Sequence, residues 1–286
     1  MKISHEHYDM MLKQIYLDCN MDEGHKIKDD MWIAPTKVLP GSRIIDKLDP
    51  FFRVIVYMGT AYIMADEKTI PGWEEILKDY PAQWFFNFGR LRKIDRILNE
   101  FDREIIDTHL YYLPDADAAK IQVPSEWKWF TQEEIDNFRE GNPFHSALCY
   151  SPTQPDVYAV AAPDGKGGYK GMAGASLDGL YTRQIGIDVK SEYRGEGLAT
   201  GLVTVLKQQI IEDGFLPFYG TGEAHALSRT VGVKSGFLPA FAEVFVGKKD
   251  EDVIRVRSVL VNSLNSTWRG SGKTWLESIT AIKLPY

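Results

Sequence analysis

The sequence predicts a mixed α/β protein, and two stretches carry that prediction. Residues 184–211 read QIGIDVKSEYRGEGLATGLVTVLKQQII. Apolar residues first alternate there, which is typical of a half-buried strand, and then recur at helical spacing. A second order of strand, helix and strand is predicted over residues 83–113. The chain of 286 residues is 44% hydrophobic and 26% charged, which favours packed cores and is long enough for two domains.

Composition argues against several classes of function. The net charge of −7 disfavours a nucleic acid as the main partner and favours a cationic or amine substrate. Cys19 and Cys149 are the only cysteines, too few for a disulfide framework, and no run approaches about 20 apolar residues. We therefore expect a cytoplasmic protein that neither spans a membrane nor binds nucleic acid.

The first half reads as an α/β unit of its own. The patterns predict helices over residues 5–17, 71–80 and 90–101, and strands over residues 83–88 and 105–113. A hairpin that turns at Gly59 is predicted over residues 50–64. Close to the first helix lie His5, His7, Cys19 and His25. On a helix His5 and His7 point in different directions, and no cluster with zinc-finger spacing follows. We expect a solvated surface there and no metal site.

Turn-forming residues 114–124 (PDADAAKIQVP) predict a boundary between two domains. The predicted division is 1–115 for the first domain, 116–250 for the second and 251–286 for a C-terminal extension that packs on the body. In the second domain, Thr131 and Glu134 form a capping-box pattern. Residues 164–168 (DGKGG) are the predicted turn of a hairpin.

The glycine-bearing turn before the helix of residues 198–211 suits a phosphate. A helix start leaves N–H groups without intrahelical partners, and Gly195 and Gly197 let the main chain approach an anion while Arg194 adds positive charge. The third glycine of a dinucleotide-binding motif is absent, and Gly272-Lys273-Thr274 lacks the first glycine of a Walker loop. A pyrophosphate is therefore the expected ligand.

Arg194, Gly197 and Ala199 fit the R-x-x-G-x-G/A signature of the GNAT superfamily of acyl-CoA N-acyltransferases, which residues 127–246 resemble. The resemblance implies a GNAT fold in this half, acetyl-CoA or CoA as the bound substrate, and transfer of an acetyl group to a small-molecule or peptide amine. It also implies antiparallel strands at 157–162 and 171–177 before the motif, and a strand at 216–221 and a helix at 226–235 after it. The implied cofactor-binding residues are Ile187, Asp188, Val189, Arg194, Gly195, Glu196, Gly197, Leu198, Ala199 and Thr200. Ile187 and Val189 would act through their main chain.

Acid-base groups are less clear in the sequence. Glu223 and His225 follow strand 216–221 and are the candidate catalytic residues. Glu223 could equally stabilise a helix N-terminus, and His225 could bind the cofactor instead. The tyrosine that often serves the family as general acid is replaced by Gly232, so that proton must come from another group, such as Tyr219, or from water. Two alternatives to an N-acyltransferase therefore stay open: a CoA-binding regulatory protein without turnover, and an interaction scaffold.

The resemblance leaves the first half unexplained. Gly89 stands where a second phosphate turn would lie, so this half is either a degenerate copy of the GNAT fold or an unrelated α/β cap. In both cases we expect one CoA per chain. Its aromatic residues are expected to form a wall of the acceptor site: Trp73, Trp84, Phe85 and Phe86.

Overall fold

The computed structural model describes residues 2–44 and 49–249, and the compact unit within them ends at Gly247. Six α-helices are described: α1 (His5–Asp18), α2 (Ile70–Leu77), α3 (Phe88–Leu98), α4 (Gln132–Ile135), α5 (Leu198–Glu212) and α6 (Ala226–Lys234). The predicted extension 251–286 lies outside the described residues.

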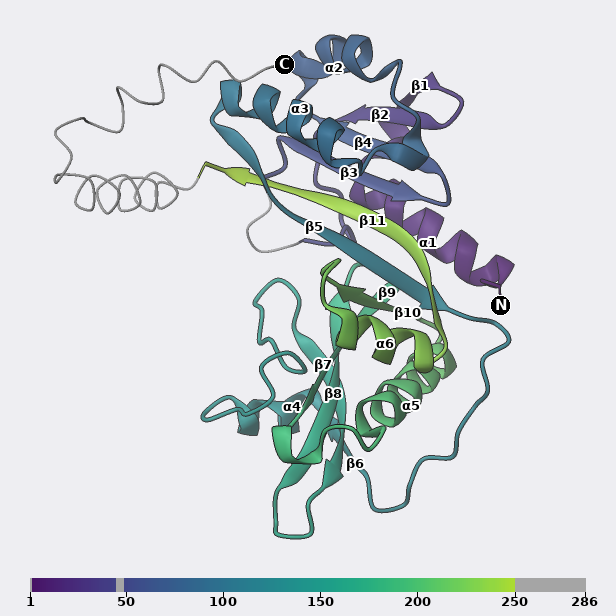
Figure 1. Ribbon diagram of the computed structural model, residues 1–286, viewed down its shortest axis with the longest axis vertical. Helices are drawn as coiled ribbons and strands as arrows, with labels where there is room; N and C mark the ends of the chain where they lie inside the picture. The colour runs from purple at the N-terminus through teal and green to yellow at the C-terminus, as the bar shows by residue number, and fades with distance from the viewer. Residues whose placement is uncertain (1, 45–48, 250–286) are drawn as a thin grey trace, which may run out of the picture. The chain divides into compact units, whose positions relative to one another are not determined.

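The described residues form one mixed sheet of eleven strands (Figure 1). The first half supplies β1 (His25–Lys28), β2 (Met31–Pro35), β3 (Phe52–Tyr57), β4 (Thr60–Ala65) and β5 (Arg103–Pro114). The second half supplies β6 (Lys128–Thr131), β7 (Asp156–Pro163), β8 (Tyr169–Asp178), β9 (Thr182–Val189), β10 (Leu216–Thr221) and β11 (Phe237–Lys248). Their order across the sheet is β1-β2-β4-β3-β11-β5-β10-β9-β8-β7-β6, which makes the predicted mixed α/β class correct.

The two halves exchange a strand in the middle of this sheet. β5, the last strand of the first half, pairs antiparallel with β10, and Tyr112 lies opposite Tyr219. β11, the last strand of the second half, pairs antiparallel with β3, and Phe241 lies opposite Tyr57. Each half therefore completes its sheet with a strand of the other.

Local signals account for most of the elements. The hairpin between β3 and β4 turns at Met58 and Gly59, whose φ angles of 47° and 84° match a two-residue turn. Thr131 and Glu134 form both reciprocal hydrogen bonds of the capping box at the start of α4.

The strand predicted at residues 83–88 is wrong. A short 3₁₀ turn (Ala82–Trp84) stands there instead, and α3 begins at Phe88. The aromatic residues of this stretch do not share one buried face, because Phe85 is buried while Trp84 and Phe88 are exposed. The Asn87 side chain accepts a hydrogen bond from the Gly89 N–H and so starts the helix.

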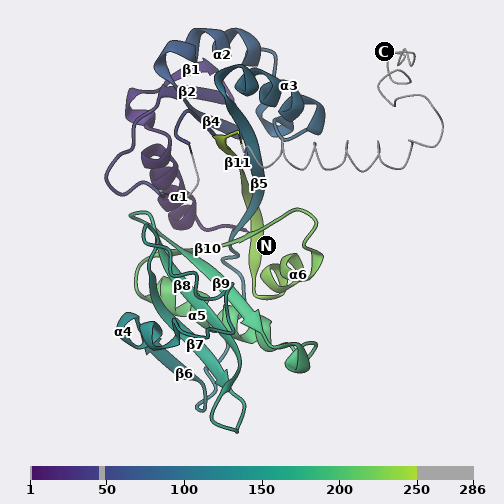
Figure 2. The same ribbon diagram turned by 90° about the vertical axis from the view of Figure 1, so that its left-hand side faces the viewer.

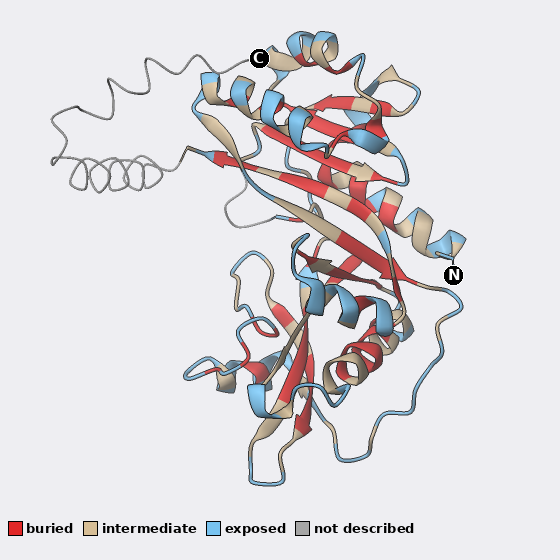
Figure 3. Ribbon diagram, viewed as in Figure 1, coloured by how far each residue is buried: buried red, intermediate tan, exposed pale blue. Residues whose placement is uncertain are grey.

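Different segments cover the two faces of the sheet around β9 and β10. α5 lies behind β7, β8 and β9 in Figure 2 and packs with Ile185, Tyr219 and Tyr112 in one buried cluster. α1 packs on the other face with Phe218 and Tyr111. Buried residues consequently concentrate along the central strands (Figure 3).

Candidate functional site

Strands β9 and β10 begin as a parallel pair and then diverge. Their pairing runs from Thr182–Leu216 to Ile185–Tyr219 and stops. Beyond that point β9 stays paired with β8 as far as Val189, and β10 stays paired with β5 as far as Thr221. Main-chain groups that a regular sheet would pair are therefore left facing one another across a gap.

A cavity of about 730 Å³ occupies this gap and extends to the glycine turn. It is lined by the ends of β9 and β10, the turn, the first residues of α5, and α6. All of the implied cofactor-binding residues except Glu196 line it, and so does His225. The sequence singled out neither His109, Ser146 nor Gln184, which also line it.

The glycine turn has the geometry of an anion cradle. Gly195 and Gly197 have φ angles of 88° and 79°, and a Cβ on either would meet nothing within 4 Å. Gly197 is the N-cap of α5, and the first helical bond runs from the Gly201 N–H to its carbonyl, at 3.1 Å. The three N–H groups before Gly201 are thus without intrahelical partners. Arg194 Nε donates to the Val189 carbonyl at 3.0 Å, which ties its exposed guanidinium to the end of β9.

Tyr219 fills the space beside Gly232. A Cβ on Gly232 would lie 3.0 Å from Cδ1 of the Tyr219 ring. The Tyr219 hydroxyl shares a hydrogen bond with Ser228 Oγ at 2.8 Å, and both residues line the cavity. Burial of the ring raises the pKa of Tyr219 above its usual value, so the hydroxyl keeps its proton at neutral pH.

The two candidate catalytic residues lie in different positions. His225 is exposed, lines the cavity and precedes α6, but its side chain makes no capping hydrogen bond. Glu223 is exposed and is not among the residues that line the cavity. Its carboxylate accepts a hydrogen bond from the Thr108 hydroxyl of β5, so it joins the end of β10 to the first half of the chain.

A segment of residues 144–148 crosses the face of the sheet opposite α5. Gly174 and Gly186 are paired across β8 and β9, and a Cβ on them would lie 2.1 Å and 2.0 Å from main-chain oxygens of that segment. The Ser146 N–H donates to Asp188 Oδ2 at 2.5 Å. Two glycines inside strands are the sequence signal that predicts such a close approach.

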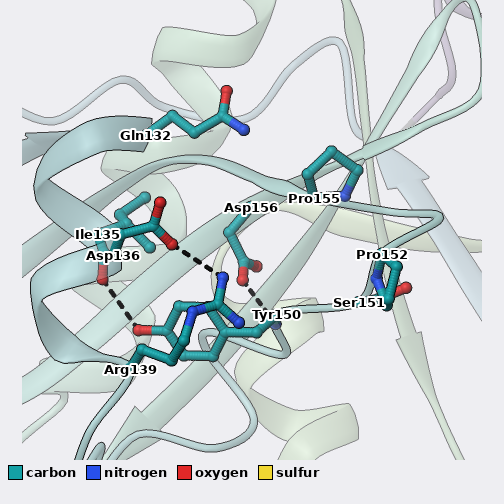
Figure 4. Close-up of a pocket in the computed structure, with 9 residues that line it drawn as sticks. All are labelled: Gln132, Ile135, Asp136, Arg139, Tyr150, Ser151, Pro152, Pro155 and Asp156. Carbon is teal, nitrogen blue, oxygen red and sulfur yellow. Dashed lines mark hydrogen bonds and ion pairs between the residues drawn. The ribbon is translucent and has the colours of Figure 1, made fainter.

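A second cavity of about 280 Å³ lies between α4 and residues 150–156 (Figure 4). Arg139 pairs with Asp136 at 2.9 Å, and the Asp156 carboxylate accepts hydrogen bonds from two main-chain N–H groups. These charged groups are satisfied within the protein. We assign this cavity no function.

Within residues 2–44 and 49–249, no three His, Cys, Asp or Glu side chains are grouped closely enough to hold a metal ion. In the same part of the chain no helix combines the length and the apolar character that a membrane span requires.

Comparison with solved structures finds N-acetyltransferases. A GCN5-related N-acetyltransferase from Kribbella flavida is 20% identical, with a TM-score of 0.38, over 54% of this chain and 63% of that one. A tandem GNAT protein from the clavulanic acid biosynthesis pathway is 17% identical, with a TM-score of 0.38, over 52% and 56%. A GCN5-related N-acetyltransferase from Sphaerobacter thermophilus is 10% identical, with a TM-score of 0.39, over 63% and 68%.

The chain thus spans less than two thirds of the first two structures. No family model matches it, and neither does any curated protein. The structural neighbours of the chain are N-acetyltransferases of the GNAT type, one of them a tandem GNAT protein.

Proposed function

We propose that this protein is an N-acyltransferase that moves an acyl group, acetyl in the simplest case, from acyl-CoA to a primary amine. One observation carries the proposal: the parallel pairing of β9 and β10 ends at Ile185–Tyr219, directly in front of the glycine turn at the start of α5. A free strand edge and an anion cradle are thus combined in one cavity.

Three parts of an acyl-CoA have proposed counterparts in this cavity: the pyrophosphate, the amide-bearing arm and the thioester. The pyrophosphate fits the turn at Gly195 and Gly197, where N–H groups and the helix dipole favour negative charge. The amide-bearing arm fits the open edge of β9 at residues 186–189, whose main chain can pair with it as a neighbouring strand would. The thioester then lies near Tyr219, at the closed end of the gap.

In the proposed reaction the amine nitrogen attacks the thioester carbon, a C–N bond forms and the C–S bond breaks. The sulfur leaves with the electron pair and needs a proton. Tyr219 is the proposed donor, because its hydroxyl is protonated and lines the cavity. Glu223 and His225 are candidates for handling the proton of the acceptor, and His225 also for holding the donor.

Release of free thiol from acetyl-CoA tests the proposal, measured with the full-length chain and a panel of small primary amines and peptide N-termini. We expect thiol release that depends on the amine and a matching amide product in the mass spectrum. Binding of acetyl-CoA without turnover by any amine would favour a CoA-binding regulatory protein. Absence of binding would contradict the proposal.

The location of the protein is a separate question, and the cytoplasm stays a prediction from the sequence.

A further inference from the structure

A histidine from the first half of the chain reaches the cavity of the second. His109 belongs to β5, just past the Leu110–Thr221 pair of the β5–β10 ladder, and lines the cavity with 28% of its side chain exposed. Paired residues of neighbouring strands point to the same face, and side chains alternate along each strand. His109 therefore shares a face with Gly220 of β10 and Asp188 of β9.

This face is the one from which an acceptor can reach the gap. α5 and α6 cover the opposite face, where Tyr219 contacts Ser228 and packs with α5. On the face of His109 the end of β10 carries two glycines. The Tyr111 ring occupies the space beside Gly220, 2.6 Å from where a Cβ would lie, whereas a Cβ on Gly222 would meet nothing within 4 Å. The approach from this face is therefore open at Gly222, which lines the cavity together with His109.

The ring of His109 is held in a defined orientation. Nδ1 lies 3.2 Å from Asp107 Oδ2, and the ring stacks on Phe245 of β11 with centroids 5.6 Å apart and planes at 19°. An ionised carboxylate only accepts, so Nδ1 carries the proton and the lone pair of the neutral ring is on Nε2. Nε2 makes no hydrogen bond to any part of the chain that the structure describes.

We propose that His109 is the general base of the transfer reaction and that Asp107 is its positioning residue. The inference rests on the proposed function. The acceptor enters as an ammonium, and Nε2 takes one of its protons. The neutral nitrogen forms the C–N bond as the C–S bond breaks, and Tyr219 gives its proton to the sulfur. The second proton of the amine restores the Tyr219 hydroxyl, and the imidazolium releases its proton to water. The sum is an amide, free CoA thiol and one proton.

Steady-state kinetics of the full-length protein test this assignment, with acetyl-CoA and the best amine of the panel. His109→Gln is expected to lower kcat by about 100-fold, the usual contribution of a general base, with the acetyl-CoA Kd unchanged by calorimetry. Asp107→Asn should lower kcat by about tenfold without raising the acetyl-CoA KM, and Asp107→Glu should recover part of the loss. His25→Gln is the matched control, because His25 also pairs with a carboxylate, Glu74, outside the cavity.

Turnover by His109→Ala in the presence of added imidazole is a second test. Imidazole would not restore turnover if His109 had only a structural role. Restored turnover supports the base role. A kcat of His109→Gln within about threefold of wild type, no rescue by imidazole, or a loss confined to Glu223→Gln would overturn it and leave the proposed function standing. Wild-type protein that binds no acetyl-CoA would overturn the proposed function and this inference with it.

Discussion

At the scale of single residues, the ring of Tyr219 lies against Gly232. The resemblance of residues 127–246 to the GNAT superfamily predicts a missing acid, because Gly232 falls where that family often carries a tyrosine. In the structure the Tyr219 ring of β10 packs closely against Gly232 of α6. A Cβ on Gly232 would lie 3.0 Å from Cδ1 of that ring. A hydroxyl is thus present in the same region, but it comes from the strand and not from the helix.

Tyr219→Phe keeps this ring and removes its hydroxyl. We expect kcat to fall by about 100-fold, because thiolate protonation would depend on water, while acetyl-CoA affinity stays the same. Loss of the hydrogen bond to Ser228 should cost about 1 kcal/mol of unfolding free energy. Kinetics with the best amine measure the first effect and urea unfolding the second.

Tyr112→Phe is the matched control. Tyr112 lies in the same buried cluster as Tyr219, and its hydroxyl also accepts a hydrogen bond, from Arg229, but Tyr112 does not line the cavity. Equal kcat values for Tyr219→Phe and wild type would remove Tyr219 from the mechanism.

At the scale of elements, the segment 144–148 depends on the two glycines beneath it. Gly186→Ala would place a Cβ 2.0 Å from the Ser146 carbonyl oxygen, a main-chain atom that must then move. Overpacking of this kind costs about 1–3 kcal/mol, and the displaced Ser146 would no longer contact Asp188. We expect a lower unfolding midpoint in urea and weaker turnover.

Gly72→Ala provides the comparison, because Gly72 lies in α2 with nothing within 4 Å of an added Cβ. It should be neutral or stabilising by about 0.5–1 kcal/mol. Similar unfolding midpoints for Gly186→Ala and Gly72→Ala would contradict the close approach of residues 144–148.

Sequence periodicity predicted single elements well where a helix or strand has one buried face. β9 and α5 are such cases. Ile185 of β9 and Leu202 and Leu206 of α5, the last two at helical spacing, are buried in one shared core. It failed at residues 83–88, where aromatic residues imitate a strand but Trp84 is exposed. Periodicity alone does not predict the divergence of β9 from β10, because the divergence depends on which strands each one pairs with on its other side.

At the scale of the whole described unit, exchanged strands join the two halves, and a buried cluster of four charges connects them. Arg43 contacts Asp18 of α1 at 2.5 Å and Glu243 of β11 at 3.1 Å. Arg53 of β3 donates to Glu243 at 2.6 Å. All four side chains are at most 6% exposed, so each charge depends on its partners.

Glu243→Gln would leave two buried arginines with one carboxylate. Breaking a buried pair in this way costs about 3–5 kcal/mol, so we expect a large loss of unfolding free energy in urea. Lys37→Ala breaks the exposed pair with Glu23 and should leave the unfolding free energy nearly unchanged, because solvent screens such a pair. Comparable losses in the two variants would mean that the cluster does not hold β11 in place.

The exchange of β5 and β11 is what the sequence could not reveal about the molecule. Turn-forming residues do separate β5 from β6, but periodicity carries no information about which strand is the partner of another. His109 shows the consequence. It lies in the first half of the sequence, so only the pairing of β5 with β10 brings it to the cavity.

Calorimetric titration with acetyl-CoA tests the central proposal most directly, using wild type, Gly197→Asp and Gly165→Asp. Both glycines have positive φ, and both have nothing within 4 Å of an added Cβ, so the backbone strain of the two substitutions is matched. Only Gly197→Asp adds a negative charge at the cradle. We predict one acetyl-CoA per chain for wild type and Gly165→Asp, and no binding by Gly197→Asp. Equal binding by all three proteins, or none by wild type, would contradict the proposed site.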